Sequence, residues 1–128
     1  MEGGALQLQK EILDKAIDIV RTAQEMEKLK KKLNCKKKEL ASAKVEQCLY
    51  VRELVKLKHK DPNDHQVICA KKHYRVIYKQ IDYFICLEEQ SIHLIRFNIL
   101  KIKRSLYLLK KTIYILTYQL LLLLIMKL

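Results

Sequence analysis

The sequence predicts an all-α protein: a long antiparallel helical hairpin or coiled coil with an apolar C-terminal helix. Three observations lead to this fold class. The 128 residues include two glycines and one proline, too few for the many turns of an all-β fold. Apolar residues recur every seven positions along most of the chain, as they do in coiled coils. A run without charged residues then occupies the C-terminal end.

The first predicted helix, residues 5–60, is defined by every seventh residue from Ala5 to Leu54, all apolar except Gln47. The companion row three residues later is only partly apolar, because it contains Lys15 and Lys36. We expect the apolar positions to form a seam against a partner helix. The seam residues are Ile12, Ile19, Met26, Leu33, Leu40, Leu54 and Leu57.

Four small or apolar residues near the start of this helix would widen the seam. Ala16 and Ala23 follow the polar positions of the companion row, and Leu13 and Val20 lie next to the main row. A stripe of that width is typical of a bundle helix. More than one partner helix could therefore dock there.

The predicted turn, residues 61–64, is Asp61-Pro62-Asn63-Asp64. Proline cannot continue a helix, and aspartate is a preferred N-cap for the helix that follows. A connection this short between two long helices predicts an antiparallel pair.

The second predicted helix, residues 65–111, repeats the period of seven. The residue types would also suit strands, but no alternation of period two is present. The main row holds one charged residue, Glu88, and Ala70, Ile77 and Phe84 flank it three residues later. The row comprises Val67, Tyr74, Ile81, Glu88, Ile95, Ile102 and Leu109.

The turn sets the register of the two helices. With the bend between Lys60 and Asp64, Tyr50 faces Tyr74, and Lys36 faces Glu88, so two polar exceptions in the seam meet. The same register predicts a cluster of opposite charges formed by Asp14, Asp18, Arg104, Lys110 and Lys111. A shift of one helical turn would also bring opposite charges together.

The C-terminal segment 112–126 has 15 residues without a charge, with lysines on both sides. As a helix it would span about 22 Å, less than the roughly 30 Å of a hydrocarbon core. Lysine snorkelling and local thinning of the bilayer would cover part of the difference, so a tail anchor is one interpretation. A buried helix is the second. The third is a substituted C-terminus, since no Asp, Glu, Gly or Ala follows Glu89.

A basic block lies within the first helix and has the lysine density of a nuclear-localisation or phosphate-binding patch. It contains no arginine and no aromatic residue, which nucleic-acid readers usually add. The alternative is a solvated helix face. The candidate anion-binding residues are Lys28, Lys30, Lys31, Lys32, Lys36, Lys37 and Lys38.

His65, Cys69 and His73 follow at intervals of four and form a weak candidate for a metal site. A closed zinc site needs a fourth ligand, which no neighbouring residue supplies, so we expect no metal. The four cysteines have no CxxC spacing, and the polar start does not resemble a secretory signal. We therefore expect a reducing intracellular compartment, cytoplasmic or nuclear.

No enzyme is expected from this sequence. Glycine occurs only at positions 3 and 4, which leaves no glycine-rich phosphate loop, and no nucleophile elbow is present. We predict no cofactor and no small-molecule substrate. The predicted function is a coiled-coil interaction or scaffold subunit that pairs with another helical protein or with itself. The alternatives are a tail-anchored membrane tether and a basic nucleic-acid-associated protein.

Overall fold

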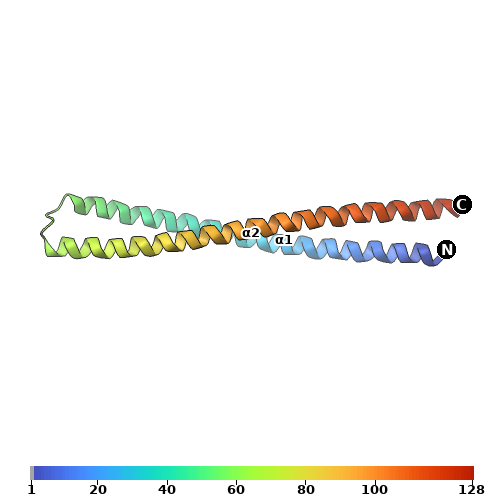
Figure 1. Cartoon of the computed structure of the whole chain (residues 1–128), viewed down its shortest axis with the longest axis horizontal. Coiled ribbons are helices and arrows are strands. Elements are labelled where there is room, and N and C mark those ends of the chain that lie inside the picture. Colours follow the sequence, from blue (N-terminus) through green and yellow to red (C-terminus); the bar gives the residue numbers. More distant parts are fainter. Residues whose placement is uncertain (1) are drawn as a thin grey trace. The chain divides into compact units, whose positions relative to one another are not determined.

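The computed structural model describes residues 2–128 as two helices, α1 (Glu2–Lys58) and α2 (His65–Met126) (Figure 1). That range contains no strand. The chain divides into two units. The turn unit is Lys32–Ile95, and the terminal unit comprises the residues up to Lys31 together with Arg96–Leu128. In each unit a segment of α1 packs against a segment of α2, which confirms the all-α helical hairpin.

α1 ends at Lys58, two residues before the end expected from the sequence, and α2 begins at His65, so the turn comprises residues 59–64. Two of the last carbonyls of α1 accept hydrogen bonds from amides just beyond its end: the His59 amide donates to Lys56 at 3.3 Å and the Lys60 amide donates to Leu57 at 3.2 Å. Asp64 caps α2, because its Oδ1 accepts from the Gln66 amide at 2.9 Å. Asp61 Oδ1 accepts from the Asn63 amide at 2.9 Å. The two aspartates therefore hold the reversal with local hydrogen bonds.

Two heptad rows of α1 are shielded from solvent in each unit: the main row, which is every seventh residue from Ala5, and the companion row three residues later. No described member of either row is exposed, and Ala43 and Leu57 are buried in the turn unit. The polar members Lys15 and Lys36 are also partly shielded. The companion row therefore stays in the helix interface although it contains two lysines. The aliphatic stems of these lysines cover the apolar surface beside them.

The companion row of α2 differs from the one read in the sequence. Phe84, three residues after Ile81, is 42% exposed, whereas Ile85, four residues after it, is buried. A heptad alternates steps of three and four residues, and in α2 the step from the main row to its companion is four. The companion row is Lys71, Tyr78, Ile85, Ile92, Ile99, Leu106, Ile113 and Leu120.

The terminal unit has a thinner core than the turn unit. Its buried hydrophobic residues are Ala5, Ile99 and Leu106. Gly4 lies close to α2, since a Cβ built on it would stand 4.0 Å from Leu123 Cδ1. Small residues in the first turns of α1 therefore allow the apolar end of α2 to approach.

Two expectations for this region were wrong. Leu13 and Val20 do not widen the seam, because they are 60% and 58% exposed. An angle of about 100° per residue turns them away from Ile12 and Ile19. Asp14 and Asp18 form no ion pair with a basic residue of α2 in the part of the chain that the structure describes. Surface charges of this kind gain little from pairing.

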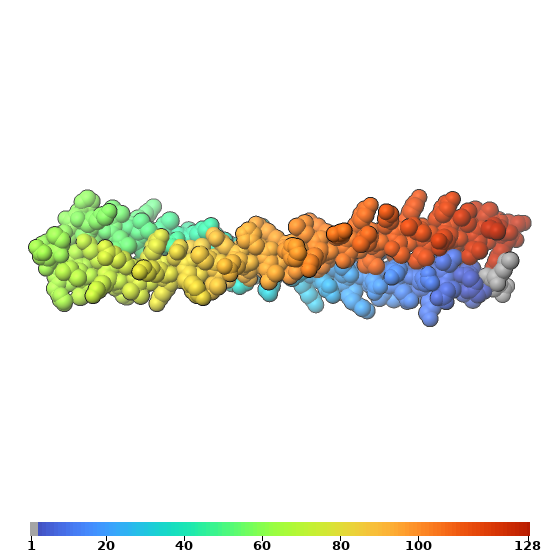
Figure 2. Space-filling model, in the orientation of Figure 1, coloured from blue at the N-terminus to red at the C-terminus, as the bar shows by residue number. Residues whose placement is uncertain are grey.

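α2 is one continuous helix to Met126. It passes Lys110 and Lys111 without a break, and the Thr112 hydroxyl donates to the Leu108 carbonyl of the preceding turn at 2.9 Å. Within the terminal unit, side chains from the last turns of α2, coloured red, stand on the surface in Figure 2. The uncharged segment is therefore an extension of the second helix.

Candidate functional site

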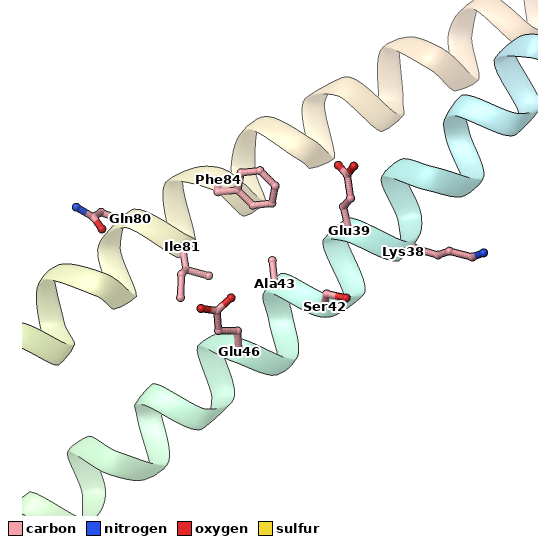
Figure 3. A pocket seen from close by; sticks show the side chains of 8 residues that line it. All are labelled: Lys38, Glu39, Ser42, Ala43, Glu46, Gln80, Ile81 and Phe84. Atoms are coloured by element: carbon pink, nitrogen blue, oxygen red, sulfur yellow. The ribbon is translucent and has the colours of Figure 1, made fainter.

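A groove of about 540 Å³ lies between α1 and α2 in the turn unit (Figure 3). The small side chain of Ala43 leaves this space opposite Ile81 and Phe84, and Lys38 points away from it. Its floor is apolar and two carboxylates stand at its rim, so it would accept an apolar side chain of another helix. The lining residues are Lys38, Glu39, Ser42, Ala43, Glu46, Gln80, Ile81 and Phe84.

A polar pair crosses the seam beside this groove. The Lys36 ammonium donates a hydrogen bond to Glu88 Oε1 at 3.0 Å and lies 3.9 Å from Glu39. Glu88 is buried, and its Oε2 accepts no hydrogen bond from the residues that the structure describes. The hydrogen bond to Glu88 raises the pKa of Lys36 above its ordinary value. The pairing predicted from the register is confirmed here.

A further aromatic contact between the helices confirms the register. The rings of Tyr50 and Tyr74 pack with centroids 5.7 Å apart and planes tilted by 47°. Gln47, the polar exception in the first row of α1, donates to Asp82 Oδ1 at 3.2 Å. Each polar interruption of the α1 row in this unit therefore has a partner on α2.

The predicted seam residues all face the chain's own second helix. Leu57 is buried, and the other six, from Ile12 to Leu54, are partly shielded. Their apolar surface is therefore already used within the hairpin. Other large apolar side chains of α1 and α2 remain exposed outside this seam.

A second apolar row on α1 supplies such a surface in the terminal unit. Leu6, Leu13 and Val20 recur every seven residues, and Ile17 lies between two of them. All four side chains are exposed. A shallow groove accompanies them, lined by Ala16, Ile17, Val20, Arg21 and Gln24. The signal for this row was present in the sequence, but Leu13 and Val20 were assigned to the seam.

The turn unit has a comparable surface on α1. Val45, Leu49 and Val55 are exposed on the side away from the seam. Two shallow grooves overlap there, and Val45 and Leu49 line both of them. α1 is therefore apolar on two sides in each unit.

The basic block does not form one face. α1 is helical throughout the block, so the lysines point in different directions around it. Lys36 is engaged with Glu88, and Lys30 lies 3.8 Å from Glu27. Lys28, Lys31, Lys32, Lys37 and Lys38 are exposed. A phosphate chain running along one side of the helix would therefore meet only some of these charges.

The histidine and cysteine side chains near the turn do not converge. Cys69 Sγ lies 3.7 Å from His65 Nε2, while His73 packs against Tyr74 with centroids 5.8 Å apart. Among the described residues, no group of three or more His, Cys, Asp or Glu side chains is placed to hold a metal ion.

The C-terminal part of α2 has the composition of a membrane segment. Within residues 2–128, α2 is the one helix long and apolar enough to cross a membrane. An 18-residue window in it has a mean hydropathy of 1.6, and none of that window is buried. Tyr114, Tyr118 and Ile125 are exposed on its surface. A core helix of a soluble protein has the same length and composition.

Comparisons of the chain with protein-family models, with curated proteins and with solved structures give no match. The assignment of function therefore depends on the helical surfaces described above.

Proposed function

We propose that the protein is a non-catalytic coiled-coil interaction subunit, which binds other helices through the outer apolar sides of its hairpin. The observation that carries this proposal is the double-sided pattern of α1. One side packs on α2, and the other exposes large apolar side chains such as Leu13 in the terminal unit and Val45 in the turn unit. A helix that is apolar on two sides is typical of a bundle with further members.

Site-specific photo-crosslinking in the full-length protein tests this proposal. A photoreactive amino acid replaces Val20 or Val45 on the outer sides of α1, and Lys60 in the exposed turn serves as the control position. We expect crosslinked products of discrete mass from the two valine positions and none from Lys60. Equal labelling at all three positions, or none at any of them, would reject an interaction through the outer sides.

A second candidate function is supported by the tail. Thr112–Met126 carries no charge, Lys110, Lys111 and Lys127 flank it, and its outer side chains are uncovered. Such a segment would hold a hairpin at a membrane, with the basic residues at the headgroups. Carbonate extraction is the test. The full-length protein should stay with membranes, and a chain ending at Lys111 should be released.

A further inference from the structure

The outer side of α1 in the terminal unit carries a heptad pattern of its own. We call it the outer stripe: its positions alternate in steps of four and three residues, which is the spacing of a coiled-coil seam. It lies on roughly the opposite side of α1 from the α2 contact, so both contacts can form at once. The stripe consists of Leu6, Lys10, Leu13, Ile17, Val20, Gln24 and Glu27.

We propose that the outer stripe pairs antiparallel with the same stripe of a second copy of this chain. This rests on the proposed function and names its partner. With the two-fold axis between residues 18 and 19, Ile17 packs on Val20 of the second copy, and Leu13 packs on Gln24. Each contact occurs twice, as in any isologous interface.

The charges along the stripe select this arrangement. In this register Lys10 lies opposite Glu27 of the second copy, and both residues belong to the stripe. Asp14 and Arg21 lie on one flank of the stripe, directly after Leu13 and Val20, and Asp14 lies opposite Arg21 of the second copy. Both pairs join opposite charges, and the two-fold axis repeats them. Within the described residues Lys10, Asp14 and Arg21 form no ion pair, and Glu27 lies 3.8 Å from Lys30 of its own helix in an exposed pair.

A parallel pairing of the same stripe is disfavoured. In register, it would set Lys10 on Lys10 and Glu27 on Glu27, which places like charges together at two layers. The antiparallel arrangement turns the same residues into opposite-charge pairs. The orientation therefore follows from residues on the stripe itself.

The other flank of the outer stripe, on the far side from Asp14 and Arg21, lets the two α1 helices approach each other closely. Ala16 and Ala23 occupy it, and the antiparallel register brings Ala16 next to Ala23 of the second copy. The shallow groove beside Ala16 contains Ile17 and Val20 in its lining, so it would receive the corresponding side chains of the other chain. Small residues at such positions let two helix backbones come near each other.

Charge reversal in the full-length chain tests both the partner and the orientation. Asp14→Arg places arginine against Arg21 of the second copy, and Arg21→Asp places aspartate against Asp14. Each variant alone should dimerise about tenfold more weakly in sedimentation equilibrium. An equimolar mixture of the two variants should form heterodimers of wild-type affinity, because both flank pairs are then of opposite charge.

Circular dichroism establishes that each variant is as helical as the wild type, and Lys10→Glu mixed with Glu27→Lys repeats the test at the stripe. A monomeric wild type, or a mixture no tighter than the separate variants, would overturn the proposal. In that case crosslinks from Val20 to a different protein would leave the proposed function standing.

A matched pair of variants excludes a general effect of surface charge. Val20→Asp should abolish the dimer, because it buries a carboxylate in the stripe. Val76→Asp changes a valine of similar exposure on α2, outside the stripe, and should leave the dimer intact. Dissociation by both variants alike would contradict a dimer formed through the outer stripe.

Discussion

The Lys36 ammonium and the Glu88 carboxylate join α1 to α2 by a hydrogen bond of 3.0 Å. A slip of one heptad would place Lys36 opposite Ile81 or Ile95 and leave Glu88 without its cation. A buried unpaired carboxylate is costly, so the slipped hairpins are disfavoured. The pair therefore specifies the register, as a polar residue in a coiled-coil seam does.

Removing one member of this pair should destabilise the protein more than removing both. Lys36→Met leaves the Glu88 carboxylate buried without a partner, whereas Lys36→Met with Glu88→Leu replaces the pair by apolar surface. We expect the single variant to melt below the wild type and the double variant to melt at or above it. Thermal unfolding followed by circular dichroism measures the order. A double variant less stable than the single one would contradict this account.

The same pair predicts a loss of stability at alkaline pH. Because the pKa of Lys36 is raised in the folded state, the pair's contribution is complete below the unfolded lysine pKa of about 10.4. It is lost as pH rises through the folded value. Urea unfolding between pH 8 and pH 11 should show the wild type losing its advantage over Lys36→Met above about pH 10. A difference that is constant over this range would argue against it.

Truncation of a core isoleucine should be far more costly than truncation of an exposed leucine two residues away. Ile92 is 4% exposed and Leu94 is 62% exposed. Ile92→Ala should lower the free energy of unfolding by about 2–4 kcal/mol, because it leaves a cavity between the helices. Leu94→Ala should change it by less than about 0.5 kcal/mol. Urea denaturation of the two variants provides the comparison.

Loss of the α2 cap should be measurable on its own. Asp64→Ala removes the acceptor of the Gln66 amide and should cost about 1 kcal/mol of unfolding free energy. Asp64→Asn keeps an acceptor at the same place and should be close to the wild type. If both substitutions have the same effect, the aspartate does not act as a cap.

The fold class and the register were predictable because they depend on few strong signals. Pro62 and the two heptads define a hairpin, and the pairing of Lys36 with Glu88 favours the register that the structure shows, although a shift of one helical turn would also bring opposite charges together. The companion row of α2 was missed because the first three residues at a step of three, Ala70, Ile77 and Phe84, are apolar, whereas the step of four begins with Lys71. The structure separates them by placing Ile85 inside and Phe84 outside.

The outer sides of α1 could not be assigned from the pattern alone. Leu13 and Val20 lie next to seam residues in the sequence, but one residue advances a helix by about 100°. Only the packed hairpin shows which apolar rows α2 covers. The surfaces proposed to bind other helices are the apolar rows of α1 that α2 leaves exposed. No sequence motif marks them, so they are identified only once the rows covered by α2 are known.

The short turn between Lys58 and His65 also has a consequence for how the chain folds. Closing a short loop costs little entropy, so the first contacts between α1 and α2 should form beside the turn, with Leu57 against Val67. Later contacts between the two helices would form one after another, moving away from the turn. The loop that each new contact closes then consists of residues that are already ordered. A nascent chain therefore cannot begin this process until the turn and the start of α2 have been synthesised. The apolar end of α2 would then be the last segment to find its place.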